Sequence, residues 1–140
     1  MLALLLALGV ASSGTGAMPP VPFTTLVEGQ QSGMEDAHQA VVRTAAEWKA
    51  LWQKHGAGQK MPVVDFAKST VIGVFLGSRP TGGYRVAITG IERDGAAMVV
   101  TWREEPPTAG LIVTQVLTSP FHLVTVERTT ADVMFTKAAR

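Results

Sequence analysis

The segment that most constrains the fold runs from Val71 to Leu76, a nearly unbroken apolar run that is typical of a strand covered on both faces. From Tyr84 to Ile88, apolar residues alternate with polar or small ones, which is typical of a strand with one buried and one partly wet face. Pro80 fits the first corner of a type I turn, and Gly82 is expected to take the left-handed conformation that closes a short hairpin. The sequence therefore predicts that the two strands pair, with a stiff loop, Gly77–Gly83, pointing outward between them.

The remaining segments predict short strands around one helix. The strand candidates are Thr24–Gln31, Ala37–Arg43, Ala96–Arg103, Leu111–Leu117, Phe121–Arg128 and Val133–Thr136. The first two are expected to pair as a hairpin, and Asp94-Gly95 is a strong signal for a turn into Ala96–Arg103. The expected fold class is α+β: a mostly antiparallel β sandwich or partly closed barrel, with one amphipathic helix packed on the sheet.

The helix is predicted from its cap and its apolar stripe. Thr44 is a suitable N-cap, and Glu47 follows three residues later in the capping-box arrangement. The stripe consists of Trp48, Leu51 and Trp52, spaced to share one face. Gly56 and Gly58 end the helix. Two tryptophans on so short a helix favour a core role, with the helix lying across the sheet.

Size and charge limit the domain count and the partners. The chain has 140 residues, which is enough for one domain, and 46% of them are hydrophobic, which is enough for a core. Its net charge is +1 without a basic run, which argues against nucleic acid or an anionic membrane surface as partner. Cysteine is absent, so disulfides, thiolate metal sites and a cysteine nucleophile are excluded.

The N-terminal residues predict export. Met1–Val10 is apolar, and the small residues after it, up to Ala17, are of the kind that signal peptidase accepts. We therefore expect residues 1–17 to be a signal peptide and residues 18–140 to form a single domain. The basic n-region is missing, which leaves two alternatives: the true start lies upstream, or Met1 is not the start. The segment is too short to cross a membrane, so no stable membrane insertion is expected. The expected location is the periplasm, the cell surface or the extracellular space.

The three histidines do not predict a metal site. His38, His55 and His122 occur in none of the usual ligand spacings. His55 ends the predicted helix, where a cation or a hydrogen bond to the last carbonyls is favourable. A metal site assembled in space from His38, His122 and an acid such as Glu35 or Asp36 is the alternative.

Other catalytic arrangements are also missing. Ser78 and Ser119 lie in turns, and neither has the Gly-x-Ser-x-Gly context of a hydrolase nucleophile. Glu104 and Glu105 are adjacent on a strand and therefore point to opposite faces. Gly82-Gly83 precedes a strand, not a helix, and so does not form a phosphate-binding loop. We expect no enzymatic activity, no metal and no cofactor.

Three proline-containing loops are the best candidates for a binding surface. Proline has already restricted such loops, so they lose little conformational entropy on binding. The candidate protein-binding residues are Arg79, Pro80, Thr81, Gly82, Gly83, Tyr84, Pro107, Thr108, Ser119, Pro120 and Phe121. The alternative is that the loops have only a structural role, with proline and glycine present because the turn geometry requires them.

An ordered series of motifs resembles the PrcB family, in particular its C-terminal domain. The series is Glu28-Gly29-x-x-Ser32-Gly33, Glu47-Trp48-x-x-Leu51-Trp52-x-x-His55, Pro62-x-x-Asp65-Phe66, Gly77-x-Arg79-Pro80-Thr81-Gly82-Gly83-Tyr84 and Thr118-Ser119-Pro120-Phe121. The resemblance extends from about Leu26 to Phe135. It implies a non-catalytic, exported protein that binds another protein, as a subunit or stabiliser of a protease complex. The lipoprotein cysteine of some members is missing.

A more distant similarity is to the chagasin-like inhibitors of papain-type cysteine proteases, which act through three adjacent loops of a sandwich. Here Arg79–Tyr84 is similar to the inhibitors' first loop, and Pro107–Gly110 and Ser119-Pro120-Phe121 follow in the same order. Arg79 replaces an asparagine, Gly82 replaces a threonine, and the third loop lacks its Arg-Pro-Trp. Inhibition is the first alternative. The second is a carbohydrate- or envelope-binding module that stacks its ligand on Tyr84, Trp102 and Phe121.

Overall fold

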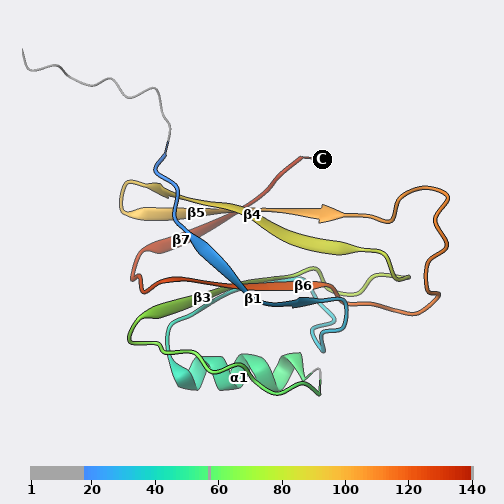
Figure 1. Ribbon diagram of the computed structural model, residues 1–140, viewed down its shortest axis with the longest axis horizontal. Coiled ribbons are helices and arrows are strands. Elements are labelled where there is room, and N and C mark those ends of the chain that lie inside the picture. The colour runs from blue at the N-terminus through green and yellow to red at the C-terminus, as the bar shows by residue number, and fades with distance from the viewer. Residues whose placement is uncertain (1–17, 57, 140) are drawn as a thin grey trace, which may run out of the picture.

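The computed structural model describes residues 18–56 and 58–139, so the predicted signal peptide lies outside the described residues. The elements are β1 (Phe23–Gly29), β2 (His38–Val42), α1 (Ala45–His55), β3 (Ser69–Phe75), β4 (Arg85–Asp94), β5 (Ala97–Glu105), β6 (Phe121–Glu127) and β7 (Asp132–Lys137). They form three layers, which Figure 1 shows from the side. A three-stranded sheet lies on a four-stranded sheet, and α1 covers the other face of the four-stranded sheet.

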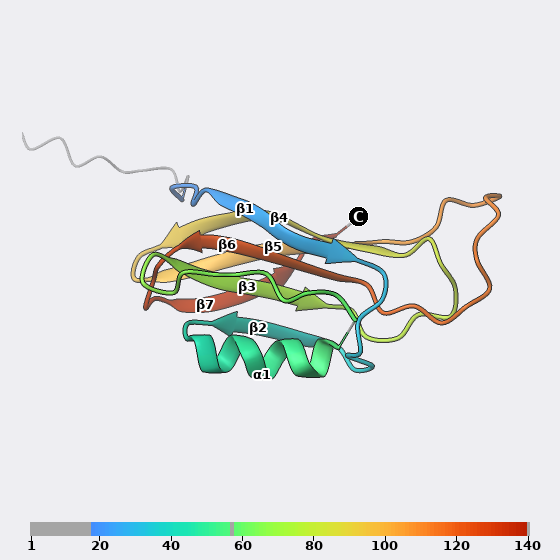
Figure 2. The same ribbon diagram turned by 60° about the horizontal axis from the view of Figure 1, so that its bottom comes forward.

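The two sheets make a sandwich, and the predicted fold class is confirmed. The four-stranded sheet has the order β1-β6-β3-β2 and is antiparallel throughout. The three-stranded sheet has the order β4-β5-β7, with β5 and β7 parallel. Of the two architectures expected, the described part of the chain adopts the sandwich and does not close into a barrel. Figure 2, turned by 60°, shows β2 at the margin of its sheet, beside α1.

The main core fills the space between the sheets. Its buried side chains are Val21, Ile72, Val74, Leu76, Val86, Ile88, Ile91, Met98, Val100, Val124 and Val126. Apart from Val21 and Leu76, they come from β3, β4, β5 and β6, mostly at alternate positions, as expected where each strand turns one face to the core. Removing such a side chain from water stabilises the fold by about 1.5–3 kcal/mol. The sandwich therefore depends on this layer.

A second core lies between the four-stranded sheet and α1. Trp48 and Leu51 are 2% and 8% exposed, whereas Trp52 is half-buried. Thr44 caps the helix, since its Oγ1 accepts a hydrogen bond from the Glu47 N–H at 3.1 Å. Gly56 ends it in the left-handed conformation, with φ of 52°. The predicted helix, its cap and its buried stripe are confirmed.

The predicted central hairpin is wrong. β3 pairs with β2 and β6, whereas β4 pairs with β5 in the other sheet. The residues between them cross from one layer to the next instead of turning back within one sheet. The burial patterns give the reason: β3 is covered by a layer on each face, and β4 has one face toward solvent. The predicted burial of the faces of β3 and β4 is therefore correct, but the predicted pairing of β3 with β4 is not.

The predicted hairpin between the first two strands is also wrong. β1 and β2 form the opposite edges of the four-stranded sheet, with β6 and β3 between them. Leu111–Leu117 forms no strand and belongs to a long loop. The turn at Asp94-Gly95 is confirmed, since it joins β4 to β5 with Asp94 opposite Ala97 and Gly95 at φ of 60°. The strands predicted near β6 and β7 are confirmed.

Candidate functional site

Two loops leave the sandwich together at one end, the right-hand end in Figure 1. One joins β3 to β4 and the other joins β5 to β6; residues 77–84 and 106–118 are called the paired loops below. Arg79 and Thr118 exchange backbone hydrogen bonds of 2.7 and 2.9 Å. The Gly82 N–H donates to the Thr114 carbonyl at 2.8 Å, and the Thr118 hydroxyl donates to the Thr81 carbonyl at 2.8 Å. Two loops far apart in the sequence therefore form one projecting unit.

Glycine geometry at the paired loops differs from the prediction. Gly82 has an ordinary backbone conformation, and the residue at positive φ is Gly83, with φ of 89°. A Cβ on Gly83 would lie 3.0 Å from Pro107 and Val113 side chains. The expectation for Gly82 was wrong because the chain makes an arch between two sheets, whose turn differs from that of a two-strand hairpin. Gly83 permits both the turn and the close packing of the second loop.

Arg79 stabilises the base of the paired loops from within. Its Nε and Nη2 donate to the two carboxylate oxygens of Glu104 on β5, at 2.6 and 3.2 Å. Its Nη1 donates to the carbonyls of Leu76 and Ser78 at 3.2 and 3.0 Å. The arginine was predicted as a binding residue, but these contacts occupy its guanidinium inside the domain. Its role is to hold the first loop to β5.

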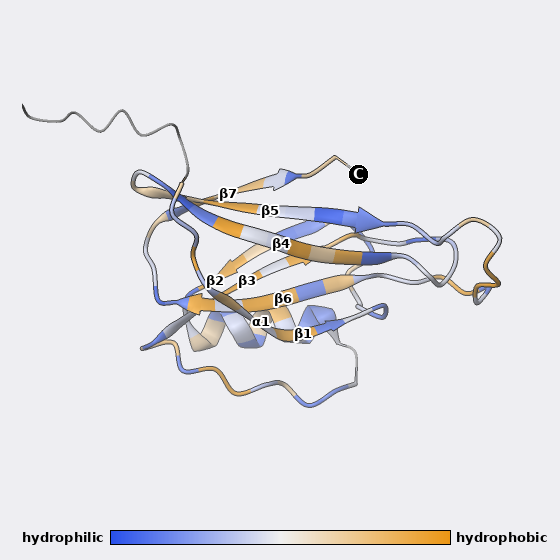
Figure 3. Cartoon of the chain, turned by 45° about the horizontal axis from the view of Figure 1, so that its top comes forward, coloured by the Kyte–Doolittle hydropathy of each residue, from blue (hydrophilic) through white to orange (hydrophobic). Residues whose placement is uncertain are grey.

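The tip of the paired loops exposes large aliphatic side chains. Ile112 is 102% exposed, Leu117 72%, Leu111 65% and Val116 48%. Residues 106–118 contain no ionisable side chain. Figure 3 shows hydrophobic segments at this projecting end of the chain. Soluble proteins seldom gather exposed apolar side chains in one place without an interaction partner.

Sequence reasoning missed these four residues because it placed Leu111–Leu117 in a strand. A segment of seven residues with five apolar ones is consistent with a strand, and its pattern alone does not show whether a pairing partner exists. The signal that was present is the pair of flanking loop signatures, Pro106-Pro107 and Ser119-Pro120. Because a loop signature lies on each side of Leu111–Leu117, neither flank provides a tight hairpin turn that would pair this segment with a neighbouring strand.

The third predicted loop does not belong to this surface. Ser119, Pro120 and Phe121 are buried. The Phe121 ring lies in the helix-side core, with its centroid 4.3 Å from that of His55. The Pro120 carbonyl accepts a hydrogen bond from the Leu76 N–H at 3.0 Å. These three residues were predicted to bind a partner, but they are buried where the chain enters β6 and so are not part of the exposed surface.

The remaining predicted residues divide between surface and interior. Pro80, Gly83 and Thr108 are exposed; Thr81, Tyr84 and Pro107 are half-buried; Gly82 is buried. A wedge of three adjacent solvent-facing loop tips, as a chagasin-like inhibitor requires, is not present because the Pro120 tip is inside the fold. The stacking platform is not present either, because Phe121 is 3% exposed.

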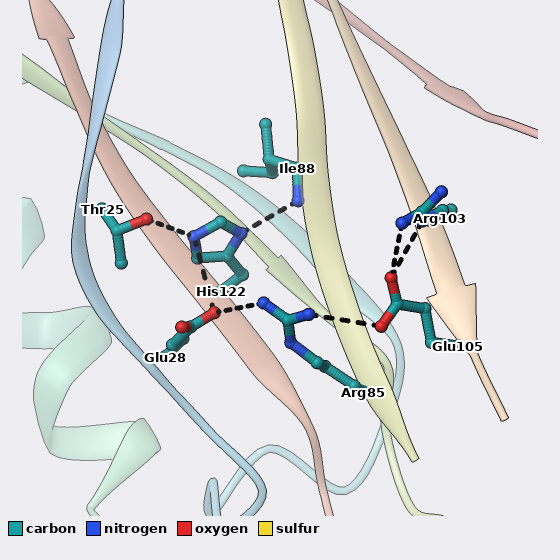
Figure 4. Close-up of polar contacts among 7 residues, drawn as sticks. All are labelled: Thr25, Glu28, Arg85, Ile88, Arg103, Glu105 and His122. Atoms are coloured by element: carbon teal, nitrogen blue, oxygen red, sulfur yellow. Dashed lines mark hydrogen bonds and ion pairs between the residues drawn. The ribbon is translucent and has the colours of Figure 1, made fainter. Parts of the chain in front are cut away.

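His122 joins three strands of the two sheets, as Figure 4 shows. Its Nδ1 accepts a hydrogen bond from the Ile88 N–H at 2.9 Å, and its Nε2 lies 2.9 Å from Thr25 Oγ1. Accepting at Nδ1 requires the neutral imidazole with its proton on Nε2. Burial lowers the pKa of His122, and the nearby Glu28 carboxylate opposes this only in part. Both ring nitrogens are occupied, so the imidazole holds the sheets together.

A chain of ion pairs continues from His122 toward the solvent (Figure 4). Glu28 Oε2 lies 3.9 Å from His122 Nε2 and 3.5 Å from Arg85. Arg85 in turn lies 3.3 Å from Glu105, which also pairs with Arg103 at 2.8 Å. Hydrogen bonding by Arg103 is the main cause that lowers the pKa of the Glu105 carboxyl. These exposed pairs link β1, β4 and β5 beside the paired loops.

His55 is buried completely, and its ring does not make the expected hydrogen bond to the last carbonyls of the helix. Its Nδ1 lies 2.9 Å from Ser32 Oγ, and its ring packs on Trp52 at 4.7 Å as well as on Phe121. Burial lowers its pKa, so the ring is a neutral core group. Within the described residues, no group of three or more His, Cys, Asp or Glu side chains is placed to hold a metal ion. The alternative site around His38 and His122 is therefore not assembled there.

Residues 70–127 match the family model described as PrcB C-terminal. This segment, 58 of the 140 residues, is similar to the PrcB C-terminal family. The match begins in β3, ends in β6 and includes both paired loops, so the resemblance carried by Gly77–Tyr84 and Thr118–Phe121 is confirmed. The PrcB segment thus contributes inner strands to both sheets. No curated protein and no solved structure matches the chain. None of the helices in residues 18–56 and 58–139 has the length and hydrophobicity that a membrane crossing requires.

Proposed function

We propose that this protein is an exported, non-catalytic domain that binds another protein through the paired loops and acts as a subunit or stabiliser of a protease complex. The observation that carries the proposal is the exposure of Leu111, Ile112, Val116 and Leu117 on a loop that is itself anchored to the domain. The PrcB C-terminal match supports the association with a protease.

The tip favours a protein partner over a membrane surface. Peripheral membrane binding usually combines apolar side chains with lysine, arginine or tryptophan at the interface. Residues 106–118 contain none of these, and the neighbouring residues 80–84 have no basic side chain. An uncharged aliphatic tip fits an apolar groove on a protein, where each large side chain contributes about 1.5–3 kcal/mol when it is fully buried.

Affinity capture from the native culture tests the proposal. The double variant Leu111→Ser/Ile112→Ser should lose a protease that the wild-type protein retains, while Val63→Ser should retain it. Val63 is a matched control because it is 93% exposed and lies in the α1–β3 connection, away from the paired loops. Capture should persist at high salt, since the contact is apolar. The captured protease should still cleave a small peptide substrate.

Two results would overturn the proposal. The first is that wild-type protein and the Leu111→Ser/Ile112→Ser variant capture the same proteins in the same amounts. The second is that the captured protease is inactive toward small peptides and recovers when the domain is removed, which would favour inhibition.

A further inference from the structure

The outer edge of β2 is open. β2 lies at the end of the sheet order β1-β6-β3-β2 and pairs only with β3. In the part of the chain that the structure describes, the backbone of residues 38–42 has no hydrogen-bond partner outside that pairing. Proteins commonly protect such edges with proline, lysine or a bulge. β2, with the sequence His-Gln-Ala-Val-Val, has none of these devices.

A hollow lies on each face of this open edge. One, of about 260 Å³, lies between the two sheets and is lined by Gln39 of β2, Phe75 of β3 and Trp102 of β5, among others. The other, of about 250 Å³, lies between β2 and α1 and is lined by Val42 and Leu51, among others. His38 lines both. An added strand would point successive side chains to opposite faces of the sheet, and therefore alternately into the two hollows.

The charged groups that line the hollow between the sheets are basic. Arg79 and Lys137 are among the lining residues, and no carboxylate is. Arg79 is occupied by Glu104 and by two carbonyls. Lys137 is more available: its side chain is 55% exposed, and its Nζ lies 3.8 Å from Glu104 and 5.4 Å from the centre of the Trp102 ring. Arg79 and Lys137 both contact the single carboxylate of Glu104, so the two cations leave a positive charge at this hollow that is complementary to a further carboxylate.

We propose that the outer edge of β2 binds an extended strand of a partner protein, which adds to the four-stranded sheet and directs an acidic side chain toward Lys137. Strand addition obtains affinity from backbone hydrogen bonds and specificity from pockets for alternate side chains, and β2 offers both. The residues next to the acidic one point toward α1, into the hollow that Val42, Ala50 and Leu51 line together with Glu47 and Lys54. A second copy of β2 is a poor occupant, because residues 38–42 contain no acid.

A peptide library provides a test that does not need the natural partner. Phage displaying random linear ten-residue peptides are panned against the purified protein, against Lys137→Gln and against the matched control Lys60→Gln, an exposed lysine of the α1–β3 connection. We expect wild-type protein and Lys60→Gln to select β-branched sequences with a fixed Asp or Glu, and Lys137→Gln to lose that acidic preference. Since Lys137 also contacts Glu104, thermal melts check that the variant folds, and Lys137→Arg should restore the preference.

One selected peptide, synthesised with its acid or with the corresponding amide, locates the site. Hydrogen exchange should show new protection at residues 38–42, and the amide version should bind about fivefold more weakly, as expected for a half-exposed ion pair. Leu111→Ser/Ile112→Ser should bind the peptide normally, which separates this site from the paired loops. The proposal is overturned by a library without binders, by binders without acidic preference, or by protection confined to β7 or the paired loops. It is also overturned if sedimentation shows a dimer of the free protein and hydrogen exchange already protects residues 38–42 in it.

Discussion

Arg79 and Glu104 form a two-pronged ion pair between the first paired loop and β5, with Nε–Oε1 and Nη2–Oε2 distances of 2.6 and 3.2 Å. Only 25% and 17% of the two side chains are exposed. Arg79→Ala would also leave the Leu76 and Ser78 carbonyls without their donor. We expect a loss of about 2 kcal/mol in the free energy of unfolding, measured by urea melts.

Arg103→Ala is the control for the Arg79 prediction. Arg103 pairs with Glu105 at the surface, with 52% of its side chain exposed, and its loss should cost under about 1 kcal/mol. Equal losses for the two variants would show that Arg79 does not stabilise the base of the paired loops.

The two tryptophans of α1 should contribute unequally. Trp48 is 2% exposed and Trp52 is half-buried, although both indole nitrogens donate to carbonyls of the following connection. Trp48→Ala should cost about 3–5 kcal/mol, as large-to-small core changes do, and Trp52→Ala should cost clearly less. Thr44→Ala should cost about 1 kcal/mol through loss of the N-cap. Urea melts that rank Trp52→Ala above Trp48→Ala would contradict this view of the helix.

Gly83 should resist substitution more than its neighbour Gly82. Gly83→Ala introduces a side chain at φ of 89° and within 3.0 Å of Pro107 and Val113. The expected cost is about 1–3 kcal/mol, the range for a residue held in a sparsely populated conformation. Gly82 has an ordinary φ, and its Cβ would meet Thr114 at 3.3 Å, so Gly82→Ala should cost less. Thermal melts of the two variants would contradict the assignment if their order were reversed.

The sequence predicted the features that depend on neighbouring residues. Thr44, Glu47 and Gly56 identify the helix because capping is a local interaction, and Asp94-Gly95 identifies the β4–β5 turn for the same reason. Pairing between distant segments is different. β1 pairs with β6, and no local pattern in Phe23–Gly29 specifies that partner.

The crossing between the sheets was nevertheless indicated in the sequence. Val71–Leu76 is apolar at nearly every position, whereas Tyr84–Ile88 alternates, and strands covered on two faces and on one face belong to different layers. The turn signal at Pro80 points instead to a hairpin within one sheet, which conflicts with this difference between the two strands. The paired loops are held together by backbone hydrogen bonds between residues 79–82 and 114–118. No sequence pattern indicates these bonds. The sequence therefore does not reveal the exposed aliphatic tip, and it does not show that Phe121 is buried.

Acid should weaken the fold through two buried imidazoles. Burial lowers the pKa of both His55 and His122 from the value of 6.5 that an unfolded imidazole has. Below that pH the unfolded chain binds protons that the folded chain does not, so the free energy of unfolding should fall as the pH drops from 6.5 toward about 5. Well above 6.5, where the imidazoles are neutral in both the folded and the unfolded chain, these two groups should contribute no slope. Urea melts across this range measure the effect, and His122→Gln should make the slope shallower; a rise in stability toward pH 5 would contradict the assignment.

The last prediction concerns inhibition of papain-type proteases. An inhibitor of the chagasin type presents three adjacent loop tips to the active-site cleft, and this domain presents two loops. Thr81 and Thr108 belong to the paired loops, but Pro120 is buried and its carbonyl bonds to Leu76. Arg79 turns its guanidinium inward to Glu104, so the first loop also lacks a free side chain at that position. We therefore expect papain to keep its full activity toward a small peptide substrate when it is titrated with the domain at micromolar concentrations. Stoichiometric loss of activity, abolished by Leu111→Ser/Ile112→Ser and retained in Val63→Ser, would instead show that the paired loops alone suffice to block the cleft.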